Sequence, residues 1–144
     1  MTAKQYLNQL KNIDKKVCNL ILEKESIWTM LTRTTTPYDK DRVQSSSNED
    51  LKEELMDRLK ELEESINYKT DKLIDKRTTI VNQINALNNY KSIDILYRHY
   101  VQFIPLTEIA KGSSYSYIWI KGLHSDALQE FERTYPTILS SVVI

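Results

Sequence analysis

Residues 51–87 read LKEELMDRLKELEESINYKTDKLIDKRTTIVNQINAL, and this stretch decides the fold class. Its Leu and Ile residues recur mainly at steps of three, four and seven, and it contains neither Gly nor Pro. This spacing predicts one apolar face on a helix of about 40 residues that begins near Asn48, whose side chain suits a helix N-cap. Lys69, Lys76 and Gln83 interrupt a strict heptad, so we expect the register to drift. The expected seam positions are Leu55, Leu62, Ile66, Leu73 and Ile80.

A similar apolar series near the start of the chain predicts a first long helix over residues 3–32. Its seam positions are Leu10, Ile13, Val17, Leu20 and Ile27. A polar linker, residues 34–50, separates the two helices. They can fold back as an antiparallel hairpin within residues 1–90 or pair between two chains, and the sequence does not choose between these arrangements. We expect a homodimer.

The composition agrees with an all-α fold and restricts the function. The 144 residues contain only 2 Gly and 3 Pro, too few for the many tight turns of a β-sandwich or barrel. Lys and Arg number 20, as do Asp and Glu, so the net charge gives no general attraction to nucleic acid or to an anionic membrane. With one cysteine, Cys18, and no secretory signal, we expect a cytoplasmic protein without a membrane partner.

Residues 91–133 differ in composition from the long helices, and this difference predicts a second, small module. Aromatic residues concentrate there, and the only glycines of the chain are Gly112 and Gly122. Pro105 is expected to start a short helix, the segment after Lys111 to break it, and Ser116 to cap a third helix. Helix, short helix, tight break and capped helix predict a helix-turn-helix domain of three helices. Residues 134–144 form an apolar tail that is expected to pack onto something.

The spacing of this module resembles the C-terminal DNA-reading domain, region 4, of bacterial sigma factors. The resemblance rests on the triplet Glu108-Ile109-Ala110, on Ser116 six positions after Ala110, and on Ala127-Leu128. Further motifs include Tyr6-Leu7-Asn8-Gln9-Leu10 near the start of the chain and Tyr115-Ser116-Tyr117-Ile118-Trp119 at the third helix. With these motifs the chain, over about residues 4–131, is similar to small phage and prophage proteins of the ArpU and RinA type, which join a coiled coil to such a domain. This similarity implies a regulator of late transcription in a bacterial host cell, with double-stranded promoter or operator DNA as its partner.

In such a domain the third helix enters the major groove, and its early residues read base edges or hold phosphates. The expected DNA contacts lie on or next to that helix, with two basic residues at the edge of the footprint. They are Ser114, Ser116, Tyr117, Trp119, Lys121, His124 and Ser125, with Arg98 and Lys111 at the edge.

Charge is the weak point of the DNA interpretation. Residues 91–135 contain five basic and five acidic side chains, so one domain is expected to bind phosphates weakly and to need a dimer or RNA polymerase as a partner. Ile118 and Trp119 suit a protein contact as well as DNA, which leaves a protein-interaction module as the alternative function. The sequence lacks a Gly-rich phosphate loop, Cys-x-x-Cys and His-Glu-x-x-His motifs, and we therefore expect neither enzyme activity nor a metal or cofactor.

Overall fold

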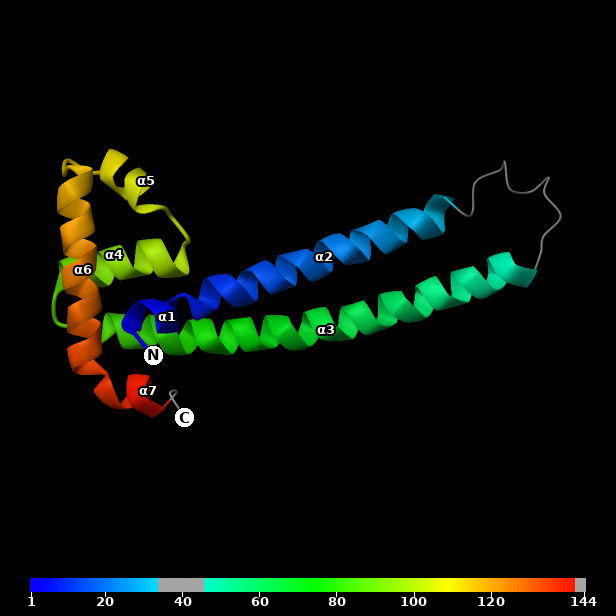
Figure 1. Cartoon of the computed structure of the whole chain (residues 1–144), viewed down its shortest axis with the longest axis horizontal. Helices are drawn as coiled ribbons and strands as arrows, with labels where there is room; N and C mark the ends of the chain where they lie inside the picture. The colour runs from blue at the N-terminus through cyan, green and yellow to red at the C-terminus, as the bar shows by residue number, and fades with distance from the viewer. Residues whose placement is uncertain (34–45, 142–144) are drawn as a thin grey trace. The chain divides into compact units, whose positions relative to one another are not determined.

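The computed structural model describes residues 1–33 and 46–141, and every regular element in these two ranges is helical (Figure 1). The all-α fold class is therefore confirmed for the described residues. The elements are α1 (Ala3–Leu7), α2 (Gln9–Arg33), α3 (Ser46–Asn85), α4 (Tyr90–Leu96), the π-helix η2 (Tyr97–Val101), α5 (Leu106–Lys111), α6 (Tyr117–Thr134) and α7 (Pro136–Ser141).

The described residues divide into two compact units. The first unit combines residues 1–13 with residues 73–141, and the second contains residues 14–33 and 46–72. This division differs from the domain boundary expected near residue 90. The start of the chain and the end of α3 share one apolar core with α4–α7, so they belong to the first unit.

In the second unit, α2 and α3 pack against each other within one chain. Ile27 and Leu31 of α2 form a buried cluster with Leu59 and Leu62 of α3, and Leu20 and Leu55 pack against its edge. An exposed ion pair between Lys24 and Glu63, 3.3 Å apart, spans the same two helices. All ten predicted seam residues of the chain are buried or half-buried: Leu10, Ile13, Val17, Leu20, Ile27, Leu55, Leu62, Ile66, Leu73 and Ile80.

The core of the first unit collects side chains from both ends of the sequence. Phe131 on α6 is fully buried, and its ring lies 5.9 Å from that of Tyr6 and 4.9 Å from that of Tyr135. The backbone N–H of Ala3 also donates to a carboxylate oxygen of Glu132. These contacts hold α1 against α6. Other buried members of the core are Leu7, Leu10, Ile80, Ile84, Leu87, Ile95, Leu96, Ile109, Ile120, Ala127 and Leu139.

Two of the polar interruptions of the heptad in α3 have partners in this core. The side-chain oxygen of Gln83 accepts the Tyr6 hydroxyl at 2.7 Å, and its backbone carbonyl accepts the Tyr135 hydroxyl at 2.7 Å. The ammonium of Lys76 lies 5.1 Å from the centre of the Tyr6 ring, a cation–π distance. A leucine at position 83 or 76 would lose the contact of that side chain with Tyr6, so polar residues replace apolar ones in the seam where α3 enters the first unit.

The ends of several helices differ from their predicted positions. The single helix expected over residues 3–32 is divided at Asn8 into α1 and α2, because α1 packs Tyr6 and Leu7 into the core of the first unit. Thr2 caps α1 in a reciprocal pair of hydrogen bonds with Gln5. The second long helix begins at Ser46, so Asn48 lies inside it and is not its cap.

The predicted packing of the C-terminal tail is confirmed for the part that the structure describes. Residues 136–141 form α7, whose Leu139 is buried in the core of the first unit. Residues 142–144 of the tail lie outside the described residues. Residues 34–45, which make up most of the predicted linker, also lie outside them.

Replacing Phe131 by alanine is expected to lower the free energy of unfolding by about 3–5 kcal/mol, because the change removes the ring and leaves a cavity between α1 and α6. Urea unfolding followed by circular dichroism measures this loss. The matched control is Ile118→Ala on the same helix, where the side chain is 83% exposed and the expected change is about 0.5 kcal/mol or less. Equal losses in the two variants would contradict the assignment of Phe131 to the core.

Candidate nucleic-acid interface

The start of α6 is fixed by serine hydroxyls in the segment that follows α5. Gly112 ends α5, and the Ser113 hydroxyl donates to the carbonyl of Ala110 while accepting the N–H of Tyr115 at 3.2 Å. The Ser116 hydroxyl then accepts the N–H of Trp119 at 3.2 Å, so the predicted cap of the third helix is confirmed. This turn leaves the first residues of α6 at the surface.

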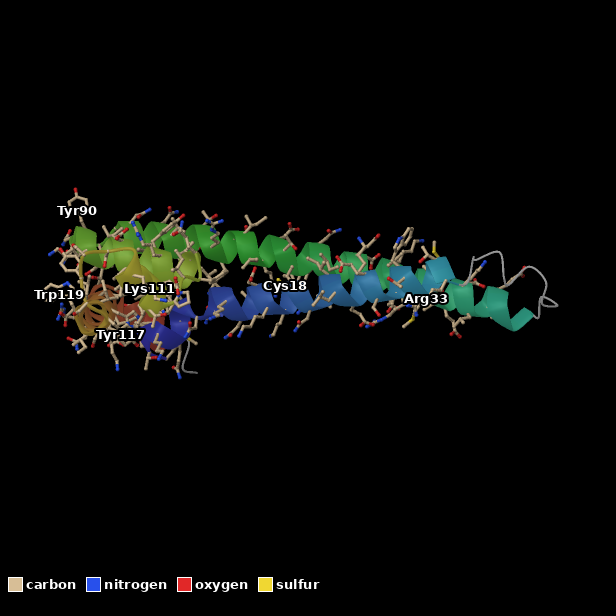
Figure 2. All side chains as sticks on the ribbon, turned by 90° about the horizontal axis from the view of Figure 1, so that it is seen from above. Cys18, Arg33, Tyr90, Lys111, Tyr117 and Trp119 are labelled. Carbon is tan, nitrogen blue, oxygen red and sulfur yellow. The ribbon has the colours of Figure 1, made fainter. Side chains whose placement is uncertain are left out.

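The two faces of α6 have different environments. The inner face buries Ile120, His124, Ala127 and Phe131, which follow one another at steps of four, three and four. The flank beside this stripe carries an exposed ridge of Tyr117, Lys121 and Ser125 at steps of four. Figure 2 shows Tyr117 and Trp119 among the side chains that project from the first unit.

Eight of the nine predicted DNA contacts are exposed, and one is not. The expectation that His124 faces the solvent is wrong, because this residue is 9% exposed and belongs to the inner stripe of α6. The exposed residues are Ser114, Ser116, Tyr117, Trp119, Lys121 and Ser125, together with Arg98 and Lys111.

His124 is held by Tyr100, with which it makes a buried hydrogen bond of 2.7 Å between Nε2 and the phenolic oxygen. Burial, with smaller contributions from His99 and Lys4, lowers the pKa of His124 to about 4. Burial also raises the pKa of Tyr100 to about 12. Both groups are therefore uncharged near neutral pH, and the hydrogen bond joins a neutral phenol to a neutral imidazole.

His99 lies beside this pair and has its own backbone partner. Its ring centre is 4.7 Å from that of Tyr100 and 5.2 Å from that of His124, both in edge-on geometry. Nδ1 of His99 lies 2.8 Å from the carbonyl oxygen of Ile104. A carbonyl can only accept, so Nδ1 carries the proton.

The two basic residues expected at the edge of the footprint both have acidic neighbours. Arg98 pairs with Asp94 at 2.9 Å, and Lys111 pairs with Glu108 at 3.6 Å. All four side chains are about half exposed or more, and such surface pairs contribute little energy. A DNA phosphate can therefore replace the carboxylate as the partner of Arg98 or Lys111, at a small cost in free energy.

Sequence reasoning did not find an aromatic cluster beside the ridge. The rings of Tyr115 and Trp119 are stacked at 5.6 Å, and the Lys91 ammonium lies 5.9 Å from the Tyr115 ring centre. Ile118 and Trp119 also line a shallow hollow of about 320 Å³ next to Gly122. The spacing of Tyr115 and Trp119, four residues apart across a helix start, was the available signal.

No helix within the described ranges is both long and apolar enough to span a bilayer. Residues 1–33 and 46–141 also hold no group of three or more His, Cys, Asp or Glu side chains suited to a metal ion. Comparison of the chain with protein-family models, curated proteins and solved structures finds no match. The function therefore has to be argued from the geometry of the site.

The buried His124 is expected to make the protein less stable as the pH falls from about 6.5 to about 4. In this pH window the unfolded chain binds a proton at His124 and the folded chain does not. The stability of the folded state is therefore highest above the pKa of the unfolded chain, and it decreases on acidification. For this site alone the loss approaches about 3 kcal/mol. Urea unfolding of the protein and of His124→Gln at several pH values measures the difference in slope. An unchanged slope in the variant would contradict the buried, neutral state of His124.

Proposed function

We propose that the chain is a DNA-binding transcription regulator encoded by a phage or prophage, acting on late genes. In this proposal α5 and α6 form the helix-turn-helix, and α6 reads the major groove of a promoter or operator. The second unit serves dimerisation or contact with RNA polymerase. The site of action is the cytoplasm of a bacterial host, and the activity requires no enzymatic step.

The outer ridge of α6 is the single observation that carries the proposal. Tyr117, Lys121 and Ser125 lie one turn apart and are exposed, along a flank of the helix next to its buried stripe. A helix that is held by one buried stripe and leaves polar side chains such as Lys121 and Ser125 exposed can present them to base edges in the major groove. Lys121 suits guanine acceptors or a phosphate, and Ser125 suits a base edge or a phosphate.

The zero net charge of residues 91–135 makes a second DNA-binding copy necessary in this proposal. Large apolar side chains of the second unit support dimerisation, since Trp28 is 58% exposed and Leu22 is 61% exposed. Trp28 and Ile21, seven residues apart on α2, line a hollow of about 590 Å³ that Leu59 also borders. A second copy of the chain would cover this apolar surface.

The change Trp28→Gln is expected to shift the protein from dimer to monomer, raising the dimer dissociation constant by about ten-fold or more. Sedimentation equilibrium measures the constant. Ser26→Gln, an exposed position on α2 outside the lining of the hollow, is the control that should leave it unchanged. A monomeric starting protein would contradict the dimer proposal.

The change Lys121→Glu is expected to weaken binding to a selected operator by about ten- to hundred-fold, because it replaces the cation of the ridge with an anion. The operator is selected by sequencing the fragments of the source genome that the purified full chain retains near physiological salt. Lys60→Glu, on the exposed surface of α3, is the matched control for the charge change. Absence of any enriched fragment, or equal loss in both variants, would contradict DNA reading by α6.

A protein-interaction module is the second candidate, and the aromatic cluster beside the ridge favours it. Ile118 is 83% exposed and Trp119 is 51% exposed, and single soluble domains seldom leave such neighbours uncovered without a partner. RNA polymerase, a repressor or another phage or host protein would be the partner. In this case Trp119→Ala would remove most of the binding and Lys121→Glu little of it, the reverse of the order expected for DNA.

A further inference from the structure

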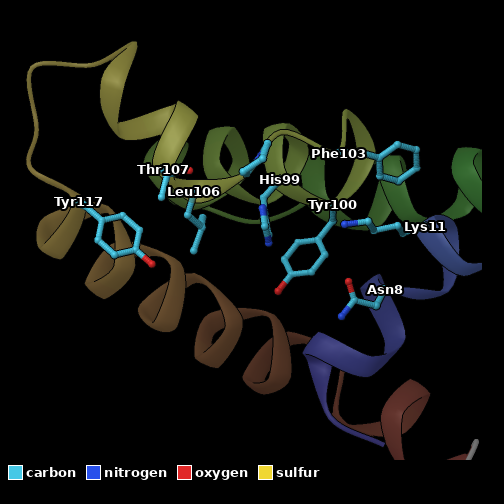
Figure 3. Close-up of a pocket in the computed structure, with 9 residues that line it drawn as sticks. Asn8, Lys11, His99, Tyr100, Phe103, Leu106, Thr107 and Tyr117 are labelled. Carbon is cyan, nitrogen blue, oxygen red and sulfur yellow. The ribbon is translucent and has the colours of Figure 1, made fainter.

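A pocket of about 330 Å³ lies inside the first unit, on the side of η2 that faces α5 and the start of α6. Figure 3 shows the side chains that surround it, which come from the junction of α1 and α2, from η2, from α5 and from α6. The volume lies at the lower end of the range of small-molecule sites, about 300–1,000 Å³. The size therefore suits a small ligand.

The polar groups of this pocket favour an anion. Lys11 is the only charged side chain among the nine residues that line it, and none of the nine is acidic. Figure 3 shows the Asn8 amide on the same side of the pocket as Lys11, and the hydroxyls of Thr107 and Tyr117 add hydrogen-bonding groups on the opposite side. An ammonium accompanied by neutral donors and no competing carboxylate is suited to one carboxylate group.

The remaining walls favour an aromatic body on that ligand. Phe103, Leu106 and Pro105 contribute apolar surface, and Tyr100 and Tyr117 contribute rings. The Tyr100 hydroxyl is already occupied by its hydrogen bond to His124, so Tyr100 offers the pocket mainly its ring. Flat rings pack well against such side chains, either offset or edge-on.

Three irregularities of the backbone meet at the pocket. The helix is broken at Asn8, the π-helix η2 contains His99 and Tyr100, and Phe103 has a φ of 60°, in the left-handed region. Phe103 is the one non-glycine with positive φ among the described residues. Left-handed backbone at a bulky residue costs energy, and both this strain and π-turns concentrate at functional sites.

We infer that this pocket binds a small aromatic carboxylate, with the carboxylate on Lys11 and the ring beside the Tyr100 side chain, which lies next to Lys11 in Figure 3. The inference does not depend on the proposed DNA binding, because the pocket is complete within one chain and its occupancy is measured without DNA.

The test titrates the ¹⁵N-labelled full chain with benzoate and follows the backbone amide signals. Saturable shifts are expected at residues 8–11, 97–107 and 117. Benzamide, which has the same shape without the charge, should bind at least about ten-fold more weakly. Hexanoate, which keeps the carboxylate without the ring, should also bind more weakly.

Two lysine variants on α2 locate the charge contact. Lys11→Gln should weaken benzoate binding by about ten-fold. Lys15→Gln, exposed on the same helix and outside the lining, should leave it unchanged. Both changes lie at exposed positions, and a native-like amide spectrum verifies the fold of each variant.

Absence of saturable shifts with benzoate would overturn the inference, as would shifts confined to residues outside the lining. Equal affinity for benzamide, or an unchanged affinity in Lys11→Gln, would overturn the role of the charge. Hexanoate binding as tightly as benzoate would overturn the aromatic character of the ligand.

Discussion

The docking of α1 against α6 is the contact on which the first unit depends. Phe131 fills the space between Tyr6 and Tyr135, and Gln83 accepts the hydroxyls of both tyrosines. The aromatic rings supply buried apolar area, while the glutamine satisfies the two phenols that burial would otherwise leave without partners. Because of this docking the chain bends at Asn8, and the bend brings the first turn of α2 to the pocket beside η2.

Much of the helical structure was predictable because it depends on local rules. The apolar period of α3 and the cap at Ser116 need only neighbouring residues, so both appear in the sequence. The docking of α1 was not predictable, since the partners Tyr6 and Phe131 are far apart in the chain and each also fits an ordinary helix seam. The same reason hid the pocket, which joins Lys11 to residues near position 100.

His124 shows a different kind of error, because the signal for its burial was present. It stands on the stripe formed by Ile120, Ala127 and Phe131, and helical position alone places it inside. Its polar character suggested the surface instead. The hydrogen bond with Tyr100 satisfies Nε2 of the histidine, and burial lowers the pKa of the ring so that it stays uncharged in the core near neutral pH. Position on the helix was therefore a better guide than residue type.

The first unit combines the start of the chain with its C-terminal half, and this determines the order in which the two units can fold during synthesis. Its core joins residues 3–10 to residues 80–139, whereas the buried cluster of the second unit needs only residues up to Leu62. On the ribosome, α2 and the first half of α3 have their partners early. Tyr6 gains Lys76 and Gln83 when the end of α3 emerges, but its contact with Phe131 forms only after α6 has been made. Until then the part of α1 that α6 covers is exposed. Chaperone binding to the nascent chain is accordingly expected to be concentrated on its first turns.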